Sequence, residues 1–228
     1  LGATSLGAIW SSCSPDFGIN GVVDRFGQIE PRVLVCADGY FYNGRQHDSL
    51  APMRGVLERI ASIETTVVIP FTGDAVALDG IRGAVTWGEF GVADSAPDYV
   101  ATPFNHPVYI MYSSGTTGVP KCIVHGAGGT VIQHLKEHML HCDIGTADRL
   151  FFFTTCGWMM WNWLVSGLTA GATIFLYDGS PFAEEGRILW RLAEEERLTA
   201  FGSGAKFIAA TEKAGVRPGD EFDLSELR

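Results

Sequence analysis

The chain has 228 residues, of which 46% are hydrophobic and 18% are charged, so it is globular and rather apolar. This length allows one large domain or two small ones. The formal net charge of −10 argues against general binding of nucleic acid, which needs a basic face. No apolar run approaches the ~18 residues of a membrane span, and no basic region opens a signal peptide.

The cysteines favour a reducing compartment. They are odd in number, dispersed, and form no C-x-x-C pair, which is typical of core thiols and not of a disulfide framework. We therefore expect a cytoplasmic protein without disulfides. The chain also begins and ends abruptly, without loose polar residues, so we expect it to be a piece of a longer protein. The cysteines are Cys13, Cys36, Cys122, Cys142 and Cys156.

The first half of the chain alternates short apolar runs with helical patterns. Met53, Val56, Leu57 and Ile60 share one face of a helix expected over residues 50–63. Glycine, aspartate and proline loosen the pattern over residues 71–107, which we interpret as a connecting segment. In chain order the predictions are a strand at 7–11, a turn at 14–18, a helix at 22–26, strands at 32–37 and 66–70, and a hairpin at 39–45.

The second half continues this alternation, and most of its strands are wholly apolar. That pattern predicts an α/β fold with largely parallel β-sheets covered by helices. Ligands bind such sheets at the carboxyl ends of the strands, so the loop after residue 112 and the turn at 157–158 are expected to line one crevice. Strands are predicted at 107–112, 122–125, 149–154, 172–177 and 199–202, and helices at 126–141, 187–198 and 206–210.

The chemistry concentrates in residues 113–121, which read Ser-Ser-Gly-Thr-Thr-Gly-Val-Pro-Lys. Glycines allow backbone N–H groups to turn toward an anion, hydroxyls add donors, and Lys121 adds a positive charge. Only four lysines occur in the chain, so a lysine in this loop is notable. The common NTPase loop is disfavoured, because Pro120 precedes Lys121 and Cys122 follows it. A polar hairpin turn is the alternative interpretation.

Three histidines lie on the helix expected over residues 126–141, and Cys142 follows directly after it. His134 and His138 have the spacing of zinc ligands on a helix. The metalloprotease motif, however, needs glutamate directly after the first histidine, and here Leu135 stands there. We therefore interpret His134, His138 and His141 as a surface or half-buried helix face.

The 113–121 segment resembles the phosphate-binding signature of the acyl-adenylate-forming (AMP-binding) superfamily. The resemblance extends through nearly all of the chain. It implies that residues 1–228 are an incomplete N-terminal AMP-binding (adenylation) domain whose C-terminal domain is absent. Other segments indicate which branch of the superfamily the chain resembles. Those at 10–18, 29–31 and 125–129 resemble short-chain acyl-CoA synthetases, and those at 37–40 and 155–162 resemble acetoacetyl-CoA synthetases.

The resemblance implies a two-step ligase reaction in ketone body and lipid metabolism. ATP and acetoacetate would give acyl-AMP and pyrophosphate, and CoA would then displace AMP. Mg²⁺ is implied as well, although the family's main segment for binding it is not found in this sequence, and no residue here is assigned to a metal. Because that segment, the ribose-binding aspartate and the C-terminal catalytic lysine are missing, we expect the isolated chain to be inactive.

The resemblance also implies roles for particular residues. Lys121 and Thr116 are expected to act in catalysis, and Trp158 and Met159 to line the acyl pocket. For Trp158 a plain core role is the alternative. Arg45 matches an arginine that contacts CoA in the family. The family also has an arginine three residues earlier, where this chain has Tyr42, so a solvated surface arginine is an equally good interpretation. The ATP phosphates are expected to contact Ser113, Ser114, Gly115, Thr116, Thr117, Gly118 and Lys121.

Two other functions stay open at this point. One is a synthetase for another short acid, such as acetate or propionate. The other is a nucleotide-binding module without synthesis activity.

Overall fold

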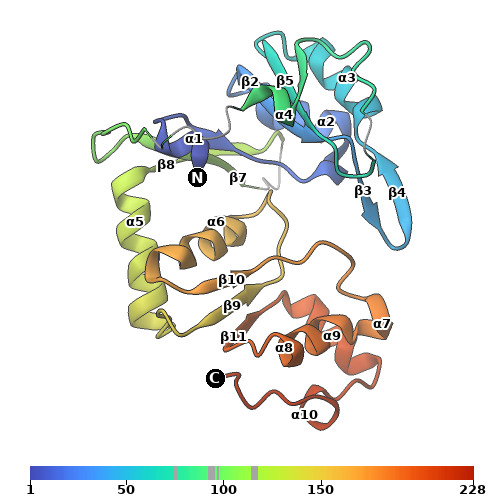
Figure 1. Cartoon of the computed structure of the whole chain (residues 1–228), viewed down its shortest axis with the longest axis vertical. Helices are drawn as coiled ribbons and strands as arrows, with labels where there is room; N and C mark the ends of the chain where they lie inside the picture. Colours follow the sequence, from blue (N-terminus) through green and yellow to red (C-terminus); the bar gives the residue numbers. More distant parts are fainter. Residues whose placement is uncertain (74–75, 92–95, 97, 114–117) are drawn as a thin grey trace. The chain divides into compact units, whose positions relative to one another are not determined.

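A computed structural model describes residues 1–73, 76–91, 96, 98–113 and 118–228. The chain divides into two compact units (Figure 1). Unit 1 comprises residues 1–103 and 107–125, and unit 2 comprises residues 104–106 and 126–228. Both units combine parallel strands with helices, so the predicted α/β fold is confirmed.

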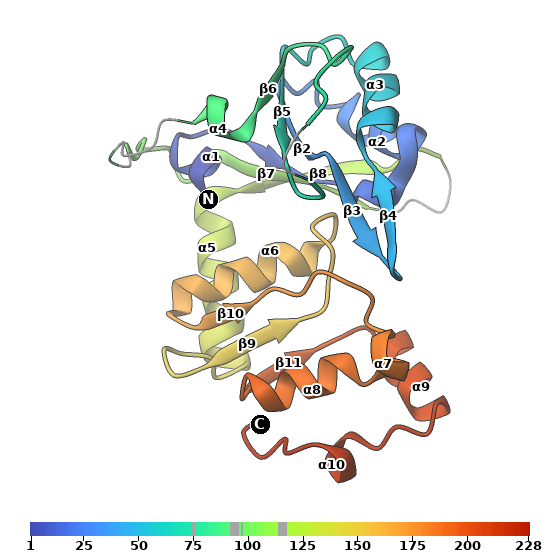
Figure 2. The ribbon, with the colours of Figure 1, turned by 45° about the vertical axis from the view of Figure 1, so that its right-hand side comes forward.

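A three-stranded parallel sheet forms the centre of unit 1, with the order β2 (Val33–Ala37), β5 (Thr65–Ile69) and β6 (Ala84–Thr86). Helices α2 (Gly18–Phe26) and α3 (Leu50–Arg59) pack beside it (Figures 1 and 2). Buried side chains from both helices and from β2 and β5 form one core. Burying these apolar side chains is the main term that stabilises the unit.

The helix predicted over residues 50–63 is confirmed, but it ends earlier, at Arg59. Ile60 has a non-helical backbone, with φ −113° and ψ 89°. Arg82 donates a hydrogen bond of 2.7 Å to the Ile60 carbonyl, which satisfies one of the groups left open at the helix end. Ile63 lies beyond the helix but is still buried, so it contributes to the core from the segment that follows α3.

The described part of the segment 71–107 contains β6 and α4 (Trp87–Phe90) before β7 (Pro107–Ser113) begins, and the chain first passes from unit 1 to unit 2 at Phe104. Asp38, after β2, holds the start of this segment. One carboxylate oxygen of Asp38 accepts hydrogen bonds from the backbone of Phe71 (2.9 Å) and Thr72 (3.0 Å). The predicted hairpin is confirmed as an antiparallel pair, β3 (Gly39–Tyr42) and β4 (Arg45–Asp48).

A second sheet of unit 1 has the order β1 (Trp10–Ser11), β7 (Pro107–Ser113) and β8 (Lys121–Gly126). Strand β1 runs parallel to β7, with Ser11 opposite Ile110. The strand predicted at residues 7–11 is therefore shorter than expected. Two short helical turns complete the unit, α1 (Gly2–Ser5) and η1 (Pro15–Phe17).

The sheet of unit 2 is parallel, with the order β10 (Thr173–Phe175), β9 (Arg149–Phe152) and β11 (Ala200–Gly202). Leu150 packs with Leu164 of α6 (Met159–Ser166). Phe151, the next residue, packs with side chains of α8 (Ile188–Glu195) and α9 (Ala205–Lys213). Because successive residues of a strand face opposite sides, this sheet is covered on both faces.

The remaining helical segments of unit 2 are short. They are η3 (Gly167–Ala170), α7 (Ala183–Gly186) and α10 (Pro218–Glu221). Among the described residues, every helix is too short or too polar to span a lipid bilayer.

The helix predicted over residues 126–141 is confirmed as α5 (Ala127–Leu135) followed by a π-helical turn, η2 (Lys136–His141). The interpretation of its histidines was wrong in part. His141 is exposed, but His134 and His138 are buried. The Nε2 atom of His138 lies 3.0 Å from the Trp163 carbonyl and 2.9 Å from the Ser166 hydroxyl, which offsets part of the cost of burying a polar ring. The Nδ1 atom of the same ring has no hydrogen-bond partner among the described residues.

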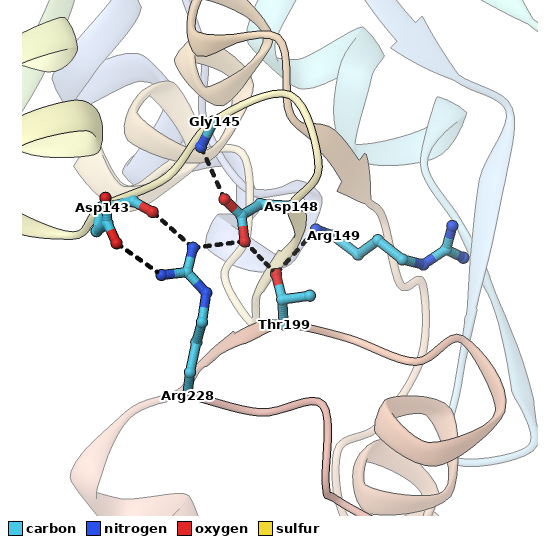
Figure 3. A network of polar contacts seen from close by, with 6 residues as sticks. All are labelled: Asp143, Gly145, Asp148, Arg149, Thr199 and Arg228. Carbon is cyan, nitrogen blue, oxygen red and sulfur yellow. Dashed lines mark hydrogen bonds and ion pairs between the residues drawn. The ribbon is translucent and has the colours of Figure 1, made fainter.

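A polar network joins the starts of β9 and β11 (Figure 3). Asp148, which is 6% exposed, accepts hydrogen bonds from the Gly145 backbone (2.7 Å), the Thr199 hydroxyl (2.7 Å) and the Arg228 guanidinium (2.6 Å). Thr199 in turn accepts a bond of 3.0 Å from the Arg149 backbone. Burial alone would raise the pKa of Asp148, but the hydrogen bonds from Arg228, Thr199 and Gly145 lower it overall.

Candidate functional site

The two ends of the 113–121 loop lie on neighbouring strands. Ser113 is the last residue of β7, and Lys121 is the first residue of β8. Gly118 has a φ of +95°, a conformation that side chains rarely adopt, and Lys121 is exposed. The predicted site residues Ser114, Gly115, Thr116 and Thr117 lie outside the described residues.

Tyr112, the residue before the loop, is held by hydrogen bonding and by aromatic contacts. Its hydroxyl lies 2.9 Å from Ser11 Oγ, and Ser11 donates its own proton to the Ile110 carbonyl at 2.9 Å. Tyr112 must therefore be the donor of the bond to Ser11. Burial raises the pKa of Tyr112 to about 12, so this hydroxyl keeps its proton at neutral pH.

Arg45 begins strand β4 at the turn of the hairpin, directly opposite Tyr42. Its side chain is exposed, and among the described residues it forms no ion pair. The guanidinium is therefore available to an anionic group. The same observations fit a solvated surface arginine, which leaves the role of Arg45 a prediction.

Trp158 and Met159 lie where the chain passes from β9 into α6, with Trp158 at the N-cap. They are 54% and 47% exposed, so both side chains leave apolar surface open within unit 2. Trp158 is not among the described core residues of unit 2, and its place in the acyl pocket stays a prediction. Trp163, in contrast, packs against the ring of His138, with centroids 4.4 Å apart, as expected for a core residue.

A second segment reaches the same end of this sheet. The backbone N–H of Phe153 donates a 2.8 Å hydrogen bond to the Gly202 carbonyl, so the residues after β9 and β11 begin side by side. Ser203 follows, and within the described part of unit 2 its buried hydroxyl oxygen has no hydrogen-bond partner. Ser203 was not among the predicted site residues, because a serine after a short strand is common.

The described residues contain no group of three or more His, Cys, Asp or Glu side chains that could hold a metal ion. His134 and His138, the pair with zinc spacing, belong to the buried interior of unit 2. Mg²⁺ requires several oxygen ligands at one place, and the described residues do not supply such a set.

Lys121 and Gly118 belong to unit 1 together with Ser113 and Arg45, whereas Trp158 and Met159 belong to unit 2. Within each unit these residues follow or flank strand ends. Loops after the carboxyl ends of parallel strands are where α/β proteins bind ligands. The arrangement in unit 1 can present backbone N–H groups and one ammonium group to an anion, and the one in unit 2 can present an apolar wall to a small organic group.

Comparison with known proteins gives consistent matches over the whole chain. The family model described as AMP-binding enzyme matches residues 1–228. Acetoacetyl-coenzyme A synthetase of Rhizobium meliloti (strain 1021) is 53% identical over 231 residues, which cover 100% of this chain and 35% of that protein. Malonamoyl-CoA synthetase of Penicillium aethiopicum is 44% identical over 232 residues, which cover 93% of this chain and 32% of that protein.

A solved structure agrees with these matches. Acetoacetyl-CoA synthetase from Streptomyces lividans has a TM-score of 0.92 and 44% sequence identity, over 99% of this chain and 34% of that one. The chain thus spans about a third of the length of the relatives that it matches.

Proposed function

Because this chain belongs to the family of AMP-binding enzymes, we propose that it is part of an acid–CoA ligase that activates acetoacetate. The observation that carries this proposal is the sequence of residues 113–121, placed between the neighbouring strands β7 and β8 with Lys121 exposed. The identity of 53% to a relative named acetoacetyl-coenzyme A synthetase supports the choice of acid.

The proposed reaction has two steps. An oxygen of the acetoacetate carboxylate attacks the α-phosphorus of ATP, and the bond to the pyrophosphate oxygen breaks with its electron pair. The thiolate of CoA then attacks the acyl carbon, and AMP leaves. The substrate carboxylate is itself the nucleophile of the first step, so the enzyme needs no nucleophilic serine or cysteine. Its task is to orient the reactants and to stabilise the charge on pyrophosphate.

The 113–121 loop is assigned to that charge. Lys121 would offer a positive charge to the phosphates, and the positive φ of Gly118 suits a backbone that turns its N–H groups toward an anion. Ser113, Ser114, Gly115, Thr116 and Thr117 complete the proposed phosphate contacts, with Thr116 and Lys121 acting in catalysis. These interactions strengthen as charge develops on the leaving pyrophosphate.

Trp158 and Met159 are assigned to the acyl pocket. Their exposed apolar surface can contact a small organic group, and methionine adapts its shape to small ligands. Arg45 is assigned to the phosphates of CoA, on the basis of its exposed guanidinium and the family resemblance. A cytoplasmic location and a role in ketone body and lipid metabolism belong to this same proposal.

A synthetase for a different acid is the second candidate. The relative named malonamoyl-CoA synthetase favours it. That relative and the acetoacetyl-CoA synthetase of known structure are both 44% identical to this chain. Identity at this level therefore does not distinguish between the two acids.

The test is a pyrophosphate-release assay on the complete parent protein with a panel of acids. We expect acetoacetate to give the highest kcat/KM, above malonamate, acetate and propionate. A higher value for one of the other acids would replace acetoacetate as the substrate. ATP binding without acid-dependent pyrophosphate release would favour a nucleotide-binding module. The 228-residue chain, assayed alongside, is expected to release no pyrophosphate.

A further inference from the structure

The residues at the end of helix α2 contact both ends of the 113–121 loop. The side-chain amide nitrogen of Gln28 donates a hydrogen bond of 2.8 Å to the carbonyl of Pro120, the residue before Lys121. The same nitrogen donates at 2.5 Å to the Asp24 carbonyl in the last turn of α2. Both partners are carbonyl oxygens, so only the nitrogen of the amide can face them.

The other end of the loop is held by two neighbours of Gln28. The guanidinium of Arg25 lies 5.9 Å from the centroid of the Tyr112 ring and 4.4 Å from that of Phe17. The ring of Phe26, which is buried, lies 6.5 Å from the Tyr112 ring. Tyr112 directly precedes Ser113, the first residue of the loop.

Arg25 is itself fixed in place. It donates a 2.8 Å hydrogen bond to the Gly21 carbonyl, one turn earlier in α2. Gln28 is tied to Asp24 in the same way. The contacts to both ends of the loop therefore come from one short rigid segment whose side chains are bound back onto their own helix.

We propose that Gln28 is a positioning residue for the phosphate loop, and that the end of α2 fixes the separation and direction of the loop's two ends. The inference rests on the proposed function, because it assumes that residues 113–121 bind the ATP phosphates. Gln28 would act through the Pro120 carbonyl, next to Lys121, and not by contact with a substrate.

The physical reason is the entropy of the loop. Tyr112 stands directly before the loop, and Pro120 and Lys121 stand at its other end. Binding groups that start from an already fixed backbone lose less conformational entropy when a ligand binds, and this preorganisation increases affinity. The bond to Pro120 also sets the orientation of the backbone from which the Lys121 side chain starts.

Two substitutions in the complete parent protein test the inference. Gln28→Glu keeps the size of the side chain but replaces the donor with a carboxylate, and Gln28→Ala removes the group. Gln133→Ala is the matched control, since Gln133 is an exposed glutamine whose amide binds the Glu137 side chain at 2.8 Å on α5. The measurements are the Kd for ATP by calorimetry and the rates of both half-reactions.

We expect both Gln28 variants to bind ATP about two- to tenfold more weakly, as the loss of one hydrogen bond predicts. Pyrophosphate release should weaken by a similar factor in kcat/KM, while thioester formation from preformed acyl-AMP stays unchanged. The control should match the wild type in all three. Because Gln28 is exposed, the thermal midpoint should not move.

An unchanged Kd for ATP in both Gln28 variants would overturn the inference. So would an equal loss in the two half-reactions, which would indicate a general structural effect. Failure of the proposed function looks different. A wild-type protein that binds ATP but activates no acid rejects the synthetase, and the ATP affinity of the variants still decides the role of Gln28. A wild-type protein that binds no ATP rejects both.

Discussion

The amino and carboxyl ends of strand β9 differ in how their polar and apolar groups are used. At the amino end, Asp148 is 6% exposed and its carboxylate accepts three hydrogen bonds (Figure 3). After the carboxyl end, Trp158 and Met159 leave about half of their surface exposed. The first end is complete in itself, whereas the second presents surface that the chain does not cover.

The same contrast holds for strand β7 of unit 1, whose carboxyl end leads into the 113–121 loop. Lys121 is exposed beyond it, while Tyr112 within the strand is bound to Ser11 and packed against Phe26. Buried polar groups that are satisfied within the chain stabilise the fold, whereas a ligand site needs a few polar groups that are free to meet the ligand. The comparison therefore separates residues that should affect stability from residues that should affect activity.

The largest effect is expected for Lys121→Ala in the complete parent protein. It should lower kcat/KM for pyrophosphate release about 10²- to 10³-fold, because a preorganised charge next to the leaving group is lost. Thioester formation from preformed acyl-AMP should be spared, since pyrophosphate has left before that step. Lys213→Ala, on the exposed face of α9, is the control. Equal losses in both half-reactions would count against the phosphate role.

A smaller effect is expected for Trp158→Ala. The KM for the acid should rise about tenfold, in the range found when part of an apolar pocket wall is removed, while the KM for ATP is unchanged. The thermal midpoint should hardly move, because Trp158 is 54% exposed. Trp87→Ala is matched in exposure, at 55%, and should alter neither KM. A clear loss of stability with no change in KM would indicate that Trp158 is a core residue and not part of the acyl pocket.

Asp148→Asn should leave both half-reactions unchanged at 25 °C and affect stability alone. Losing the charge-assisted bond to Arg228 should lower the local free energy of unfolding by about 1–3 kcal/mol at pH 7. Hydrogen exchange of the β9 and β11 amides in the complete protein measures this, with exposed Asp220→Asn as the control. A loss of activity without a loss of protection would break the comparison between the two strand ends.

The difference in stability between wild type and Asp148→Asn should depend on pH, because the pKa of Asp148 is lowered in the folded state. A carboxylate whose pKa is depressed in the folded state stabilises it above the unfolded pKa of about 3.9. The contribution is lost as the pH falls through the lower folded value. Wild type and Asp148→Asn should therefore converge in stability below about pH 4. A difference that stayed constant down to pH 3 would show that charge is not its source.

Local sequence patterns determined much of the fold. Apolar runs such as residues 66–70 became buried parallel strands, because a strand covered on both faces needs apolar residues on both. The spacing of Met53, Val56 and Leu57 produced the buried face of α3, since helical periodicity sets which side chains share a face. The composition of residues 113–121 predicted the anion-binding loop, and its role is still a proposal.

Only the tertiary structure decided which residues meet across long distances in the chain. Gln28 and Pro120 are 92 positions apart, and nothing in the sequence around either predicts their hydrogen bond. His138 was expected at the surface or half buried, but it is buried, and the Trp163 carbonyl and the Ser166 hydroxyl satisfy one of its two ring nitrogens. Periodicity records the local preference of each residue, but the partner that makes a polar group suitable for burial is chosen by packing.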